Sequence, residues 1–134
     1  MMTRSITEFF DLGGKGVIVT GGATGIGKAI ALRLAEAGAS VIIADIDLGV
    51  ASRTVEAIQA EGGKAQAVVA DAGSLVDARK VAEECVQAFG CVDILVNNAG
   101  IYPPSPVLDM REETWDKVLS INLKGVFFYS QAAA

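Results

Sequence analysis

The sequence predicts an α/β fold in which helices cover both faces of a parallel β-sheet. Short, continuous apolar runs alternate along the chain with longer segments whose apolar residues recur every three or four positions. Within the short runs polar and apolar residues do not alternate, as expected for strands that are buried on both faces of a parallel sheet. With 134 residues and 51% hydrophobic side chains, the chain has the size and composition of one domain, residues 1–134.

The apolar runs predict four strands, at Gly16–Thr20, Ser40–Asp45, Ala65–Asp71 and Asp93–Asn97. The segments between them predict three crossover helices, at Gly25–Ala37, Gly49–Glu61 and Ser74–Phe89. A glycine follows each helix, at the position that favours a left-handed C-cap: Gly38, Gly62 and Gly90. These strands are expected in the spatial order 3-2-1-4, which is the first half of a doubly wound sheet.

The remaining segment predicts a loop followed by one long helix. Pro103, Pro104 and Pro106 exclude a helix from Ile101–Asp109. Arg111–Ala134 contains no proline and a single glycine, so the helix is expected to run to the last residue. Because no stop signal ends this helix, we expect an incomplete chain, whether a fragment, a cleavage product or a truncated reading frame.

Charge and composition exclude several classes of function. The net charge of −5 leaves no basic patch for nucleic acid or for an anionic membrane surface. No apolar stretch reaches the roughly 18 residues of a membrane span, and Met1–Asp11 lacks a signal-like apolar run. We therefore expect a cytoplasmic protein. Without histidine, Cys85 and Cys91 cannot form a Cys/His zinc site, and no metal site is expected.

A glycine-rich turn, TGGATGIG, joins the first expected strand to the first helix at Thr20–Gly27. Gly21 allows a tight turn, Gly25 lets the backbone approach a pyrophosphate, and Gly27 lets the helix pack closely on the strand. The amides and the positive dipole end of the helix favour a bound anion. Glycine-rich turns also occur in doubly wound domains that bind nothing there, but the strand-turn-helix context favours a Rossmann-type dinucleotide site.

Asp45 ends the second expected strand, near the distance from the glycine turn at which an acid accepts hydrogen bonds from the adenosine ribose. A carboxylate there repels a 2′-phosphate, and neither Ile46 nor Thr24 supplies a compensating cation. The sequence therefore favours NAD over NADP as the cofactor. The alternative is that Asp45 is an acid at a helix N-terminus that interacts only with the helix dipole.

Four further features accompany TGGATGIG: Asp45, Asp71 after the third strand, NNAG at Asn97–Gly100, and Asn122 in SINLKGVFF. Together they closely resemble the short-chain dehydrogenase/reductase family over essentially all 134 residues. The resemblance implies an oxidoreductase that interconverts a secondary alcohol and a ketone by hydride transfer with a nicotinamide cofactor. A methyltransferase, as another doubly wound nucleotide-using fold, is disfavoured by NNAG and by the spacing of Asn122.

The resemblance also implies roles for individual residues. The pyrophosphate turn would comprise Gly21, Gly25, Ile26 and Gly27, with a hydroxyl donor from Thr24, and Asp45 and Ile46 would lie at the adenosine ribose. Asp71 and the backbone of Ala72 would meet the adenine edge. Asn98, Ala99 and Gly100 would stabilise the sheet centre and touch the ribose near the nicotinamide. Asn122 would help to hold a water-linked proton relay; otherwise it is a buried amide that interrupts a helix and must find partners.

The family also has a catalytic Ser and a Tyr-x-x-x-Lys pair, and this sequence contains no such set. Pro106 lies four residues after Tyr102, and Ala133 lies four residues after Tyr129. Tyr102 could line a substrate mouth, whereas Tyr129 is most simply a packing residue. We therefore expect the chain to be inactive alone. A non-catalytic NAD-binding or interaction module remains the alternative.

Half of a doubly wound sheet is expected to leave surface uncovered. The fourth strand would expose an edge, and the last helix has more apolar residues than one sheet face covers. In the family that this sequence resembles, the corresponding helix packs between subunits. Both observations predict a homo-oligomer formed through the last helix or the exposed strand edge.

Overall fold

The computed structural model describes residues 5–134 and shows one four-stranded parallel sheet with the order β3-β2-β1-β4. The strands are β1 (Gly16–Thr20), β2 (Ser40–Asp45), β3 (Lys64–Val69) and β4 (Ile94–Val96). The predicted fold class and strand order are therefore confirmed. β3 and β4 end earlier than the sequence predicted, so Asp71 and Asn97 lie in the loops that follow these strands. Met1–Arg4, the start of the segment without a signal-like run, lie outside the described residues.

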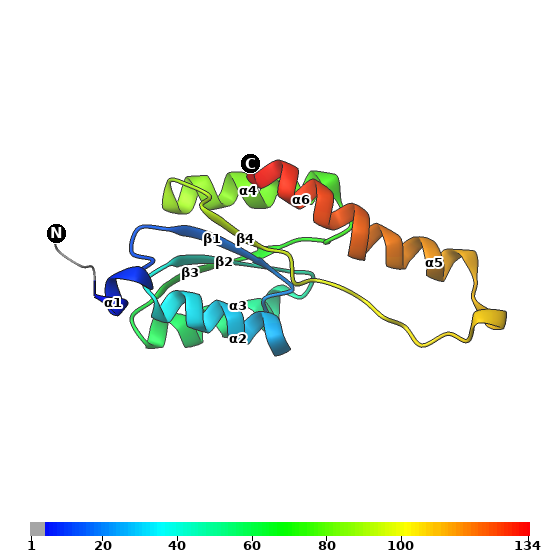
Figure 1. Cartoon of the computed structure of the whole chain (residues 1–134), viewed down its shortest axis with the longest axis horizontal. Coiled ribbons are helices and arrows are strands. Elements are labelled where there is room, and N and C mark those ends of the chain that lie inside the picture. The colour runs from blue at the N-terminus through cyan, green and yellow to red at the C-terminus, as the bar shows by residue number, and fades with distance from the viewer. Residues whose placement is uncertain (1–4) are drawn as a thin grey trace.

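Helices cover both faces of the sheet, as Figure 1 shows. On one face lie α2 (Gly25–Glu36) and α3 (Leu48–Ala60), and on the other lie α4 (Leu75–Phe89) and α6 (Val126–Ala133). Neighbouring strand residues divide between the two resulting cores. Val17, Val19, Val41 and Ile43 face α2 and α3, whereas Ile18 and Ile42 face α4 and Tyr129 of α6. This division explains why each strand is a continuous apolar run.

The helix ends follow from local signals that the sequence carries. Asp47 and Ser74 cap α3 and α4 by accepting hydrogen bonds from the amides of Val50 and Asp77. The expected C-cap glycines all adopt positive φ: Gly38, Gly62 and Gly90. A short helix that the sequence reading did not predict, α1 (Ile6–Phe9), precedes the sheet and is closed by a capping box between Ser5 and Glu8.

After β4 the chain leaves the sheet and returns along a helix, and this excursion projects beyond the body of the molecule (Figure 1). The proline-rich loop ends in a 3-10 turn, Val107–Asp109, and α5 (Glu112–Leu119) follows. The expected single helix is helical from Glu112 to Ala133, but Ser120–Gly125 is a π-helical segment between α5 and α6. Among residues 5–134, no helix combines the length and apolar content that a bilayer crossing requires.

Candidate dinucleotide site

The carboxyl ends of all four strands lie along one edge of the sheet because the strands are parallel. Every residue predicted to contact a cofactor lies at the end of a strand at this edge, in a loop that leaves it, or in the first turn of α2. The glycine turn begins at Thr20, the last residue of β1; Asp45 ends β2 and Ile46 follows it; Asp71 and Ala72 follow β3, and Asn98–Gly100 follow β4. In an open α/β sheet this edge is where ligands bind.

Two glycines in the first turn serve different structural purposes. Gly25, at the start of α2, has φ +53°, and a Cβ atom there would meet nothing within 4 Å. Gly27 has no such space, because a Cβ atom would overlap the Gly21 oxygen and the side-chain amide of Asn98. Gly25 thus leaves an open cradle beside the turn, and Gly27 allows α2 to pack directly on it.

The first turn of α2 presents backbone amides without carbonyl partners, as at any helix N-terminus. Thr24 is the N-cap residue, with extended φ of −142°, and its side chain does not cap these amides. Thr24, Gly25 and Ile26 are all exposed. Such amides, together with the positive end of the helix dipole, favour a bound anion such as a phosphate group.

Asn98 ties the turn to β4. Its side-chain amide donates hydrogen bonds to the carbonyl oxygens of Thr20 and Gly21, both at 3.0 Å. The buried Thr20 hydroxyl accepts the backbone amides of Asn98 and Ala99 at 3.1 Å each and donates to the Val96 carbonyl at 3.3 Å. The structure therefore joins Asn98 to the end of β1, with Thr20 as its partner.

The Asp45 carboxylate is held by two backbone amides. Its Oδ2 accepts a hydrogen bond from Ala23 in the glycine turn at 3.1 Å, and its Oδ1 accepts one from Asp47 at 3.2 Å. The acid that caps α3 is Asp47, whose Oδ1 accepts the Val50 amide at 3.0 Å. Asp45 thus bridges β2 to the turn rather than acting as the helix cap, and Ile46 beside it is 74% exposed.

The loop after β3 is fixed by hydrogen bonds from three directions. The Asp71 amide donates to Asp77 Oδ2 at 2.8 Å, and Asp71 Oδ1 accepts the Gly73 amide at 2.8 Å. The hydroxyl of Tyr129 donates to the Asp71 carbonyl at 3.1 Å. Burial raises the pKa of Tyr129, and the nearby carboxylates of Asp77 and Asp71 raise it further, so its hydroxyl stays protonated. Tyr129 is the packing residue that was expected, with an additional hydrogen bond to this loop.

Asn122 lies in the π-helical segment and is exposed rather than buried, which corrects the expectation from the sequence. It nevertheless finds partners for both ends of its amide. Its Oδ1 accepts the Ile101 amide at 2.9 Å, and its Nδ2 donates to the Ile101 carbonyl at 2.7 Å. Its contacts therefore hold the segment immediately after NNAG.

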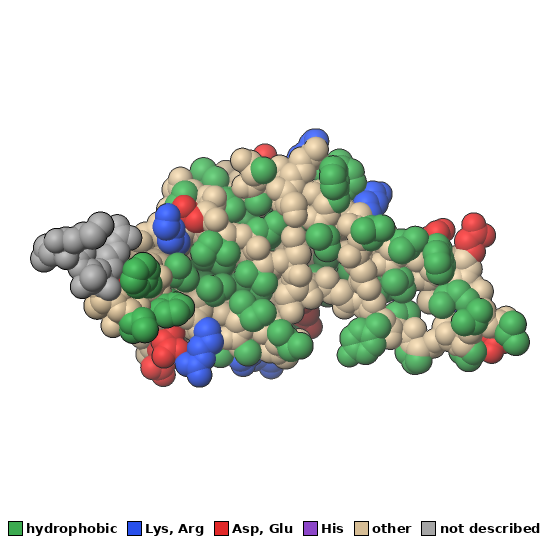
Figure 2. Space-filling view, viewed as in Figure 1, with side chains coloured by type: hydrophobic (Ala, Val, Ile, Leu, Met, Phe, Trp, Pro, Cys, Tyr) green, Lys and Arg blue, Asp and Glu red, His purple; other side chains and the backbone are tan. Residues whose placement is uncertain are grey.

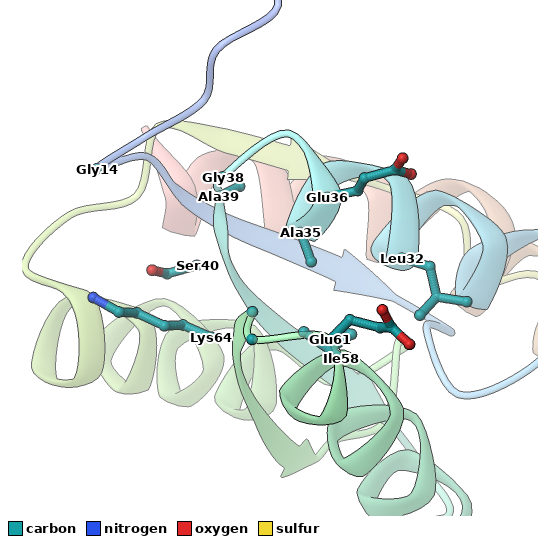
Figure 3. A pocket seen from close by; sticks show the side chains of 12 residues that line it. Gly14, Leu32, Ala35, Glu36, Gly38, Ala39, Ser40, Ile58, Glu61 and Lys64 are labelled. Atoms are coloured by element: carbon teal, nitrogen blue, oxygen red, sulfur yellow. The ribbon is translucent and has the colours of Figure 1, made fainter.

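Several cavities lie outside the glycine turn. One, of about 640 Å³, lies between the proline loop and α5 and includes Tyr102, which is 94% exposed. Another, of about 630 Å³, opens at the opposite end of the sheet between the C-terminal ends of α2 and α3 (Figure 3). No residue predicted to bind a cofactor lines this cavity between α2 and α3.

The two cysteines lie near the amino end of the sheet. Burial raises the pKa of Cys85 to about 11, and its thiol donates to the Cys91 carbonyl at 3.2 Å. The Cys91 thiol donates to Asp93 Oδ2 at 3.0 Å, which raises the pKa of this thiol. Both thiols are thus engaged in hydrogen bonds within the fold, which fits a structural role.

The sequence reading missed Thr20 and Thr54, the two buried polar side chains of the described core. Both contact the glycine turn, Thr20 through Asn98 and Thr54 by donating to the Ala23 carbonyl at 3.0 Å. A usable signal was present for Thr54. It lies on the helix face defined by Ala51 and Ile58, where a polar residue needs a buried partner.

The fold and the turn define a Rossmann-type dinucleotide-binding domain, and sequence comparison defines the family. Residues 15–134 match the short chain dehydrogenase family. The chain belongs to this family, a class of oxidoreductases that use nicotinamide cofactors.

Individual relatives agree with this assignment. The chain is 47% identical over 124 residues to L-rhamnose 1-dehydrogenase (NAD(P)(+)) of Azotobacter vinelandii, covering 90% of this chain and 48% of that protein. A short-chain type dehydrogenase/reductase from Mycobacterium marinum superposes with a TM-score of 0.93 at 37% identity, covering 97% of this chain and 53% of that one.

A short chain dehydrogenase from Burkholderia cenocepacia, solved in complex with NADP, superposes with a TM-score of 0.87 at 42% identity and covers 91% of this chain and 50% of its own. The chain thus spans about half the length of the relatives it matches.

Proposed function

We propose that this chain is the NAD-binding part of an oxidoreductase that interconverts a secondary alcohol and a ketone by hydride transfer. Membership of the short-chain dehydrogenase family supports the oxidoreductase class and a nicotinamide cofactor. The observation that carries the choice of NAD is the Asp45 carboxylate, which is hydrogen-bonded to the glycine turn at Ala23.

The residues at the sheet edge fit a dinucleotide. Gly25 leaves an open cradle beside the unpaired amides of α2, where a pyrophosphate would bind with Gly21, Thr24, Ile26 and Gly27. Because its Cβ position is empty and its φ is positive, Gly25 combines the space and the backbone shape that such a group requires.

At the ribose end, each Asp45 oxygen accepts one backbone amide and keeps lone-pair capacity for a ribose hydroxyl. A 2′-phosphate would place a second negative group against this carboxylate. Neither Thr24 nor Ile46, the exposed neighbours in the two loops, is a cation that could offset the repulsion. These features support NAD over NADP in this chain, although the Burkholderia cenocepacia neighbour was solved with NADP.

The remaining site residues would align the rest of the cofactor. Asp71 and the Ala72 backbone lie in the hydrogen-bonded loop after β3 and would meet the adenine edge. Asn98, Ala99 and Gly100 would lie at the ribose near the nicotinamide. When bound, NAD supplies the hydride acceptor, and Asn122 would hold the segment after NNAG through Ile101 and contribute to a proton relay.

We further propose that the 134-residue chain does not turn over substrate by itself. Neither of its tyrosines is followed four residues later by a lysine, and the Tyr129 hydroxyl is engaged with the Asp71 carbonyl. The same absence of a Tyr-x-x-x-Lys pair favours the alternative function, a non-catalytic NAD-binding or interaction module. An assay of NAD reduction by this chain extended beyond Ala134 to the length of its relatives separates the two, since only the first predicts turnover.

Self-association is the second part of the proposal. Leu119, Leu123 and Phe127 recur at four-residue spacing and remain 40%, 66% and 62% exposed. Hydrophobic side chains also crowd the projecting part of the molecule (Figure 2), and β4 pairs with β1 on one side. We expect sedimentation velocity to show an oligomer that Leu123→Glu dissociates; a wild-type monomer at tens of micromolar would contradict this.

The test of the cofactor assignment is Asp45→Ala, measured by calorimetric titration with NAD and NADP. The variant should bind NAD about tenfold more weakly, the cost of one or two hydrogen bonds to a charged group, and should bind NADP at least as well as the wild type. Asp47→Asn is the matched control, because asparagine also caps helices and the change removes a neighbouring charge without touching the turn. Unchanged affinities for both nucleotides in Asp45→Ala would remove the ribose assignment.

A further inference from the structure

Thr54 is a buried hydroxyl in the middle of α3, a helix that otherwise faces the sheet with apolar residues. Its side chain is 1% exposed and lies on the same helix face as Ala51 and Ile58. Burial of an unpaired hydroxyl is unfavourable, and the Thr54 hydroxyl is paired outside its own helix. It donates a hydrogen bond to the Ala23 carbonyl at 3.0 Å, across 31 positions of sequence.

Ala23 is the residue through which the glycine turn contacts Asp45. It is 2% exposed, its carbonyl accepts from Thr54, and its amide donates to Asp45 Oδ2 at 3.1 Å. The two peptide groups that flank Ala23 are thus held on opposite sides, one by α3 and one by the end of β2. A movement of Ala23 would change the orientation of the Asp45 carboxylate directly.

We infer that Thr54 is a positioning residue for the ribose end of the cofactor site. By fixing Ala23, it holds the Asp45 carboxylate in the orientation that accepts ribose hydroxyls and opposes a 2′-phosphate. Thr54 does not contact the cofactor in this arrangement; it acts through Ala23 and sets the preference for NAD over NADP. The inference rests on the proposed function, because it assigns a role at the same site.

The variant that isolates the hydroxyl is Thr54→Val, which keeps the shape of the side chain and leaves the Ala23 carbonyl without its partner. The quantity to measure is the ratio of the dissociation constants for NADP and NAD, by calorimetric titration of the 134-residue chain. This ratio should fall about tenfold in Thr54→Val, as expected when a hydrogen bond to a charged group is misaligned. Thr54→Ser, which restores the hydroxyl, should return the ratio to within about twofold of wild type.

A purely structural role for Thr54 predicts a different result. Lost stability would weaken the binding of NAD and NADP equally and leave the ratio of their dissociation constants unchanged. Ile58→Val, on the same face of α3, is the control for lost packing without a lost hydrogen bond. If Thr54→Val does not fold, Thr54→Ala also lacks the hydroxyl and predicts the same fall in the ratio. An unchanged ratio in the folded variant would overturn the inference.

A second measurement needs no nucleotide. The Ala23 amide should exchange with solvent faster in Thr54→Val than in wild type, relative to amides in β2, and Thr54→Ser should restore the slower rate. Unchanged exchange at Ala23 would overturn the inference even if the wild type binds NAD as proposed. A wild-type chain that binds neither nucleotide would instead overturn the proposed function and the role of Thr54 with it, so the two failures are distinguishable.

Discussion

Gly27→Ala tests whether the glycine turn is held closed by direct contact of α2 with Gly21 and with the side chain of Asn98. A Cβ atom at Gly27 would lie 2.9 Å from the Gly21 carbonyl carbon and closer still to the Gly21 oxygen and to Asn98 Nδ2. Relief requires either that α2 moves away from the turn or that Asn98 gives up its bonds to Thr20 and Gly21. Overpacking of this kind costs about 1–3 kcal/mol, and the loss of two hydrogen bonds adds about 1 kcal/mol each.

We therefore expect Gly27→Ala to lower the free energy of unfolding by about 3–5 kcal/mol, measured as a shift in the urea midpoint at unchanged m-value. Gly25→Ala is the matched control in the same turn. Its Cβ atom meets nothing within 4 Å, and its φ of +53° costs an alanine only about 1–2 kcal/mol. A Gly27→Ala protein as stable as Gly25→Ala would refute the close-packed turn.

Two further predictions address the segments that flank the sheet. Asn122→Ala removes both hydrogen bonds to Ile101, so the Ile101 amide should exchange faster by NMR while the chain's NAD reduction stays at zero; unchanged exchange would contradict the pairing. Cys91, Gly16 and Lys15 donate to Asp93 and lower its pKa to about 2. The ionised Asp93 therefore stabilises the fold at a pH above the ordinary carboxyl pKa, and this stabilisation is lost as the pH falls toward 2. In urea titrations, the free energy of unfolding of wild type should exceed that of Asp93→Asn, and this difference should shrink between about pH 4 and pH 2. A pH-independent difference would remove this account.

The sheet could be predicted from the sequence because its strands are buried on both faces. The resulting apolar runs in β1 and β2 have no polar interruption, and their predicted bounds agree with the structure. β3 and β4 were predicted too long: Asp71 and Asn97 lie in the loops that follow these strands, and Ala70 adds only one backbone hydrogen bond, to the Asp45 carbonyl at 2.9 Å, beyond the last paired residue of β3. The pattern of apolar and polar residues along a sequence identifies a strand better than it identifies the last residue that pairs with the neighbouring strand.

The π-helical segment could not be predicted from periodicity. The residues of Ser120–Gly125 are compatible with an α-helix, but the segment is wound as a π-helix. Two of its residues contact segments that are distant in the sequence. Gly125 packs where a Cβ atom would overlap the Ala72 carbonyl oxygen, and Asn122 pairs with Ile101. Neither contact leaves a local trace in the sequence.

The candidate site was predictable as a set of positions but not as a network. The glycine turn, Asp45 and NNAG each carry a local pattern, so they could be named in advance. That Asn98 bonds to the turn, and that Thr54 holds Ala23 from another helix, depends on tertiary packing. Thr54 alone carried a hint, as a polar residue on a buried helix face.

The measurement that tests the central claim most directly is a calorimetric titration of the purified 134-residue chain with NAD and NADP, paired with an assay of NAD reduction against a panel of secondary alcohols. The account predicts that NAD binds more tightly than NADP and that no alcohol is oxidised by this chain alone. Absence of nucleotide binding, or a preference for NADP, would contradict the assignment of the glycine turn and Asp45 as an NAD site; turnover would contradict the proposal that the chain is inactive by itself.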